Sequence, residues 1–187
     1  DELGSYSTNA GWGERVQNLR RAAELINGTV GMPGEEFSVE QTTLPYTEEN
    51  GYVAGSAYEN GQIVESIGGG LCQVSTTLYN AVLYAELEVT QRASHSMSVS
   101  YVDPSRDAMI AEGISDFKFV NNYDTPILIE GYIDSNNQLG FYIYGKDTRD
   151  AEHSVEFESE TLETTEYTTK YVEDTEAEIG SQETEGA

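Results

Sequence analysis

Three consecutive glycines, Gly68 to Gly70, are followed after one leucine by Cys72, the only cysteine among the 187 residues. Glycines allow a sharp turn and the close approach of another molecule, because they lack a Cβ atom. The residues that follow, through Leu87, have the apolar spacing of an amphipathic helix. Cys72 should therefore lie at or just before a helix N-terminus, where unpaired N–H groups favour a thiolate. The segment predicts a cysteine nucleophile; the alternative is a buried free cysteine beside a tight turn.

The order of the predicted elements indicates the fold class. Apolar spacing predicts a helix over Glu14–Ile26, and Asn27-Gly28 supplies its C-terminal stop. The second half of the body predicts strands over Ser94–Val102, Ala108–Ala111, Phe117–Val120, Ile127–Ile133 and Leu139–Tyr144, with a hairpin connection at residues 134–137. Helices first and strands later favour an α+β fold, in which the N-terminal helix and the Cys-bearing helix pack on a mainly antiparallel sheet.

Composition divides the chain into a body and a tail. Residues 1–150 are long enough for one well-cored domain. Residues 151–187 carry twelve acidic residues and one lysine, are rich in Thr and Glu, and contain few large apolar residues. This composition predicts an acidic linker or tail. The alternation in His153–Glu158 could add one edge strand to the body.

The net charge of −25 restricts the partners. Nucleic acid and anionic membranes both demand clustered Lys and Arg, so neither is expected to bind. No apolar run has transmembrane length, which predicts a soluble fragment, and we expect a monomer. The sequence starts at Asp1, so we expect a processed protein or a piece of a longer one, without its signal peptide.

His95 is the only histidine of the body. A thiol needs a base to be a strong nucleophile near neutral pH, and imidazole is the usual one. His95 starts the core-facing row of the predicted strand 94–102, so a dyad with Cys72 is plausible; a core histidine bonded to neighbouring backbone is the alternative. A zinc site would need three or four Cys or His ligands, so no metal or other cofactor is expected.

Further residues complete the candidate site. Asp107 is the first candidate to orient the imidazole, with Asp103 and Asp116 behind it, although many Asp residues are only solvated or cap turns. Arg106 could pair with Asp107 or bind a substrate carboxylate. The backbone N–H or side-chain amide of Gln73 could help to hold an oxyanion.

Ordered motifs across residues 1–150 resemble the VanW family. They are Arg15, Asn18-Leu19, Ile26–Thr29, Met32–Ser38, Glu49–Tyr52, Gly68–Ala81, Arg92, His95-Ser96, Tyr101-Val102, Arg106–Ala108, Asp116–Phe119 and Asn121-Asn122. The glycine-rich cysteine segment is the most distinctive of them. The tail resembles the lead into the wall-associated, glycine-containing module that often follows this domain.

The resemblance implies a bacterial cell-envelope protein, typically Gram-positive, located outside the cell. It also implies an L,D-transpeptidase that forms 3–3 cross-links between peptidoglycan stem peptides. In this chain Cys72 would form the thioester, His95 would be the base and Asp107 its orienting group, with Gly69, Gly70, Gln73 and Arg106 near the oxyanion or the substrate. The alternative is a non-catalytic module that binds cell-wall peptide or glycan in a cleft beside Cys72.

Overall fold

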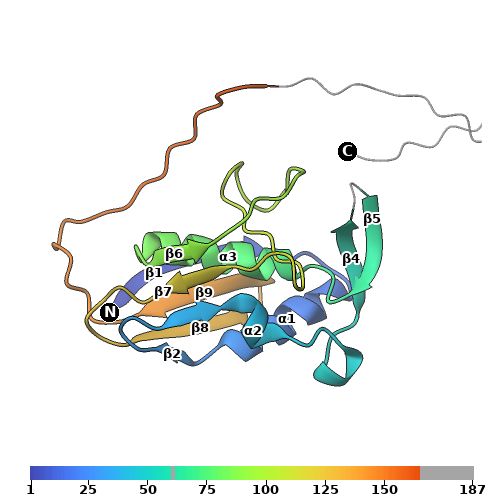
Figure 1. Cartoon of the computed structure of the whole chain (residues 1–187), viewed down its shortest axis with the longest axis horizontal. Coiled ribbons are helices and arrows are strands. Elements are labelled where there is room, and N and C mark those ends of the chain that lie inside the picture. Colours follow the sequence, from blue (N-terminus) through green and yellow to red (C-terminus); the bar gives the residue numbers. More distant parts are fainter. Residues whose placement is uncertain (60–61, 165–187) are drawn as a thin grey trace, which may run out of the picture.

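The protein is represented by a computed structural model that describes residues 1–59 and 62–164 (Figure 1). Its main sheet has four antiparallel strands in the order β1 (Glu2–Asn9), β9 (Gln138–Tyr144), β8 (Ile127–Ile133) and β2 (Thr29–Gly31). A second sheet has the order β3 (Glu36–Ser38), β7 (Lys118–Val120) and β6 (Glu88–Gln91). The hairpin of β4 (Ala54–Glu59) and β5 (Gln62–Ile67) forms a third sheet.

Two long helices pack on the main sheet. Helix α1 (Arg15–Ile26) contacts β8, and helix α3 (Leu71–Tyr84) contacts β1 and β9. Helix α3 lies so close to β1 that a Cβ atom on Gly4 would overlap the backbone of Ala85, so only glycine fits there. The short helix α2 (Val39–Thr43) and the 3₁₀ turn η1 (Glu48–Asn50) connect the second sheet to the hairpin.

The main sheet is buried on one face only. Along β8 and β9 one set of alternating residues is buried against the helices: Ile127, Ile129, Ile133, Leu139, Phe141 and Ile143. On the other face the rings of Tyr132 and Tyr142 stack across the strands, with centroids 5.5 Å apart. The alternation is that of an antiparallel sheet with one covered face.

The α+β prediction is confirmed, and both predicted helices are present. Helix α3 ends at Tyr84 instead of Leu87, because Glu86 has a positive φ of 55° and the N–H of Leu87 bonds to the carbonyl of Val82. This left-handed ending closes the helix. The predicted strands at 117–120, 127–133 and 139–144 correspond to β7, β8 and β9. Strand β1 was not predicted, because only part of it alternates clearly between apolar and polar residues.

The predicted strand Ser94–Val102 is wrong, and Ala108–Ala111 forms only isolated bridges. These bridges are Ala93 with Met109 and Ala111 with Ser115. The alternation of serine with apolar residues suits a strand, but no neighbouring strand pairs with residues 94–102. Side chains hold the segment instead, and Figure 1 shows it as a long excursion above α3.

The start of the tail lies on the body without forming the edge strand predicted at His153–Glu158. The Phe157 ring packs on Tyr84, with centroids 5.0 Å apart, and the His153 ring lies 2.7 Å from a carboxylate oxygen of Glu86. Most of the predicted lead into a wall module, residues 165–187, lies outside the described residues. No helix in the described part is long and apolar enough to cross a bilayer.

Candidate active site

Backbone packing fixes the position of Cys72, the second residue of α3. Gly68 and Gly70 have positive φ values of 80° and 100°, and Gly70 is the residue before the first helical turn. A Cβ atom on Gly69 would overlap the carbonyl of Gly55 on the β4–β5 hairpin. The Asn18 side chain of α1 donates to the carbonyl of Gly69 at 2.9 Å. The glycines thus let three elements meet directly in front of the cysteine.

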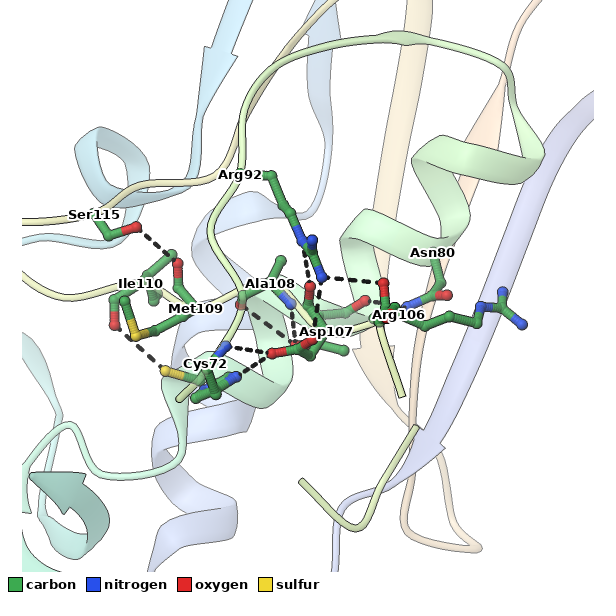
Figure 2. Close-up of polar contacts among 12 residues, drawn as sticks. Cys72, Asn80, Arg92, Arg106, Asp107, Ala108, Met109, Ile110 and Ser115 are labelled. Atoms are coloured by element: carbon green, nitrogen blue, oxygen red, sulfur yellow. Dashed lines mark hydrogen bonds and ion pairs between the residues drawn. The ribbon is translucent and has the colours of Figure 1, made fainter. Parts of the chain in front are cut away.

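The Cys72 side chain is half-buried and points toward a loop distant in sequence. Its sulfur lies 3.3 Å from the carbonyl oxygen of Ile110, to which the thiol donates (Figure 2). A carbonyl accepts from a thiol but offers nothing to a thiolate. Attack by the sulfur requires a base that removes the thiol proton.

His95 and Asp107 form a close pair beside this thiol. The ring Nδ1 of His95 lies 2.6 Å from Oδ2 of Asp107, and the backbone N–H of His95 donates to the same oxygen at 2.6 Å. The His95 side chain is only 9% exposed. Since an ionised carboxylate only accepts, Nδ1 carries the proton and Nε2 is left as the base.

Titration of the pair reflects these contacts. Burial by itself would lower the pKa of His95, but side-chain hydrogen bonding with Cys72 and with Asp107 outweighs it and raises the pKa above 6.5. Burial would likewise raise the pKa of Asp107, but hydrogen bonds from the backbone and ring of His95 lower it below 3.8. Cys72 and Asp107 therefore both raise the pKa of His95, and Asp107 is hydrogen-bonded directly to its ring.

Arg92 holds the carboxylate in place. Its Nε donates to the Asp107 carbonyl at 2.7 Å, and its Nη2 donates to Oδ1 of Asp107 at 3.1 Å and to the Ser105 carbonyl at 3.0 Å (Figure 2). The planar guanidinium suits such a fork. Sequence reasoning assigned no role to Arg92; the signal available was its position among the family motifs, three residues before His95.

Arg106 lies elsewhere and does not pair with the Asp107 carboxylate. Its guanidinium packs over the rings of Tyr6, Tyr84 and Phe157, with 4.7 Å to the centroid of Phe157. Such cation–π contacts attach the start of the tail to the body. Neighbouring side chains along an irregular backbone point apart, which is why Arg92 and not Arg106 meets Asp107.

The Gln73 side chain is buried, and its polar atoms are already hydrogen-bonded within the protein. Its side chain is 1% exposed, donates to Thr8 and to the Asn9 carbonyl, and accepts from Arg15. Its backbone N–H donates to the Gly70 carbonyl at 3.0 Å. An oxyanion would therefore have to displace bonds that Gln73 already makes.

The other two candidate aspartates do not contact His95. Asp116 caps α2, since its carboxylate accepts from Ser38 at 2.6 Å and from the Glu40 N–H at 2.9 Å. Asp103 is exposed in the turn before Ser105.

Two tyrosines that the sequence did not single out lie close enough to Cys72 to sense its charge. Burial raises the pKa of Tyr46 to about 12, and the charges of Glu40, Asp116 and Cys72 add to the effect. Burial also raises the pKa of Tyr101, followed by the charge of Cys72. Both phenols therefore stay protonated at neutral pH. In the described residues no group of three or more His, Cys, Asp or Glu side chains could hold a metal ion.

Comparisons with known proteins agree with the motifs. The family model described as "VanW like protein" matches residues 14–144. One curated relative, "Uncharacterized protein YoaR" of Bacillus subtilis (strain 168), is 43% identical over 130 residues, 68% of this chain and 43% of the relative. Another, "Vancomycin B-type resistance protein VanW" of Enterococcus faecalis (strain ATCC 700802 / V583), is 30% identical over 146 residues, 72% of this chain and 53% of the relative.

The matched part thus spans about half the length of these curated relatives, 43% and 53%. No solved structure matches the chain. The family match contains the whole glycine-rich segment together with Cys72, Arg92, His95 and Asp107. The chain belongs to the VanW family.

Proposed function

We propose that the protein is a peptidoglycan L,D-transpeptidase that forms 3–3 cross-links through a thioester on Cys72. The observation that carries the proposal is the position of His95: Cys72 raises its pKa, its ring lies 2.6 Å from Asp107, and Arg92 lies behind the carboxylate. A nucleophile, a base and a group that orients the base are the parts that acyl transfer requires.

In the first half-reaction the Cys72 proton passes to Nε2 of His95, and the sulfur attacks the carbonyl carbon of the third stem residue. A C–S bond forms, the C–N bond to the terminal D-amino acid breaks, and the imidazolium returns its proton to the leaving amine. Asp107 stabilises the imidazolium during this step, because the carboxylate stays ionised.

The developing oxyanion needs N–H donors that are not already in use. Within the described residues, the backbone N–H groups of Cys72 and Gly70 have no acceptor, whereas that of Gln73 donates to the Gly70 carbonyl. We assign the oxyanion to the first two. In the second half-reaction the side-chain amine of a neighbouring stem attacks the thioester and releases the thiolate.

We place the protein in the cell envelope, outside the cell, since its substrate is found there. The tail, residues 151–187, would be the linker toward a wall-associated module. The alternative, a module that only binds wall peptide or glycan, requires neither the thiol proton transfer nor the His95–Asp107 pair.

Purified disaccharide–tetrapeptide muropeptides provide the test. Intact-mass measurement should find an acyl-enzyme, heavier by the donor minus its leaving residue, followed by 3–3 dimers. Cys72→Ala should abolish both products. His95→Ala should slow thioester formation by about 10²–10⁴-fold, the range for loss of a general base. His153→Ala, which changes the only other histidine, is the matched control and should match wild type.

Circular dichroism and melting temperature check that each variant is folded. If folded Cys72→Ala still forms dimers, or if wild type never acylates with amidated and non-amidated stems alike, the transpeptidase is excluded. Binding of the muropeptide without acylation would then identify the binding module.

A further inference from the structure

A pocket lies beside His95 and Asp107, and Cys72 is not among its lining residues. Its volume is about 290 Å³, just below the 300–1,000 Å³ in which proteins bind whole drug-sized ligands. It therefore suits one extended side chain rather than an entire muropeptide. The walls come from the irregular segment 92–107. An extended strand over residues 94–102, as the sequence predicted, would not form this pocket.

The lining combines apolar and polar groups. Met97, Val99 and Pro104 supply apolar surface, and four serine hydroxyls supply polar groups, those of Ser94, Ser96, Ser98 and Ser105. None of these hydroxyls has a hydrogen-bond partner among the residues that the structure describes. Unpaired hydroxyls beside apolar surface suit a ligand with an alkyl chain and a polar end.

The charged residues of the lining indicate the chemistry of the ligand's polar end. Besides His95, the charged or titratable residues of the lining are Arg92, Asp103 and Asp107. The charges of Arg92 and Asp107 neutralise each other in an ion pair, with Nη2 and Oδ1 3.1 Å apart. Arg92 donates two further hydrogen bonds to backbone carbonyls. The Asp103 carboxylate has no partner within residues 1–59 and 62–164. The pocket therefore carries one uncompensated negative charge while His95 is neutral.

We propose that this pocket binds the acceptor substrate as a primary ammonium on an alkyl chain, with Asp103 and the serines around the charged end. The proposal rests on the proposed function and adds the place of the second substrate. The acceptor would approach the thioester from the His95 side, which leaves the side of Ile110 and Gly70 to the acyl donor.

The ammonium loses one proton to solvent and becomes the attacking amine, which forms a C–N bond as the C–S bond breaks. Its second proton passes to His95, so that imidazolium and Cys72 thiolate are left together. Return of that proton to the sulfur restores the resting thiol. Asp103 touches the acceptor only and takes no proton in this scheme.

The test separates binding from chemistry. Nα-acetyl-L-lysinamide, which carries one ammonium, is titrated into the resting protein, and binding is followed by NMR shifts of residues 94–105. Asp103→Asn should raise its Kd by about two- to fivefold, the loss of one ion pair at an exposed carboxylate. Glu112→Gln, which removes an exposed carboxylate outside the pocket, should leave the Kd unchanged. Nα,Nε-diacetyl-L-lysinamide, without the charge, should bind more weakly and equally to all three proteins.

The same variants are then compared in cross-linking, where Asp103→Asn should raise the KM for the acceptor. If the lysinamide binds Asp103→Asn as tightly as wild type, or more tightly, the ammonium site is overturned; tighter binding would indicate an anionic occupant. Absence of an acyl-enzyme on wild type, with Asp103-dependent lysinamide binding intact, would reject the proposed function while leaving the ammonium site standing.

Discussion

The nucleophile and the base of this site are held by different kinds of interaction. Cys72 sits where backbone meets backbone: Gly69 against Gly55, with Asn18 bridging from α1. His95 lies on an irregular segment that side-chain hydrogen bonds keep in place. The Asp107 carboxylate binds the ring and the backbone N–H of His95, and Arg92 binds Asp107.

This difference predicts how substitutions act in the two regions, the backbone packing around Cys72 and the polar network around His95. Close backbone packing leaves no room for an added methyl group, so a change there should appear in stability. A polar network can lose one member and keep its shape, so a change there should appear in chemistry and in pH dependence. The two halves can therefore be separated by experiment.

The largest expected effect is on the rate of thioester formation, from a substitution in the polar network around His95. Asp107→Asn should reduce thioester formation by about a hundredfold or more, because an amide neither fixes the Nδ1 proton nor stabilises the imidazolium. The loss should be smaller than that for His95→Ala, since the base itself remains. Stopped mass-spectrometric sampling of the acyl-enzyme gives the rate, and an unimpaired variant would remove Asp107 from the mechanism.

The next effect is on the backbone side. Gly69→Ala should destabilise the fold by about 3 kcal/mol, the upper range for overpacking, because its methyl group would overlap the Gly55 carbonyl. The melting temperature should fall by about 6–12 °C. Gly113→Ala is the control: no atom lies within 4 Å of its Cβ position, although its φ is positive, 69°, and that of Gly69 is not. If both variants melt alike, backbone contact does not anchor the cysteine.

The pH dependence of stability sharpens the contrast. Because the pKa of His95 is raised, its contribution is complete below 6.5 and is lost as pH rises through the folded value. Because the pKa of Asp107 is lowered, its contribution is complete above 3.8 and is lost as pH falls through the folded value.

The difference in melting temperature between wild type and Asp107→Asn should therefore be greatest between pH 3.8 and 6.5 and shrink on both sides. The penalty for Gly69→Ala should show no such maximum, since no titrating group takes part in that contact. A flat Asp107→Asn difference would mean that the pair does not stabilise the fold.

The smallest effect concerns the tail. Removal of residues 159–187 should leave the melting temperature of the body nearly unchanged, because the segment offers little apolar area. Removal of residues 151–187 also takes away Phe157 and His153, so it should cost about 1 kcal/mol, the scale of one cation–π contact and one exposed hydrogen bond. A large drop on the shorter truncation would show that the distal tail packs as part of the fold.

Much of the fold follows from local patterns. Helix spacing gave α1 and α3, and alternation gave β7, β8 and β9, because these elements bury one face against the core. Alternation misled at residues 94–102, where a strand-like pattern has no partner strand. Strand formation needs a neighbour, and a single sequence does not say where that neighbour lies.

The sequence by itself determined the chemical inventory of the site: one cysteine after three glycines, one body histidine, and an aspartate twelve residues beyond it. Only the tertiary structure decided the connections. It placed Arg92 rather than Arg106 on Asp107, turned Gln73 inward, and brought the Ile110 carbonyl to the sulfur. Residue type fixes which bonds a side chain can make, whereas the choice among partners depends on how an irregular backbone aims each side chain.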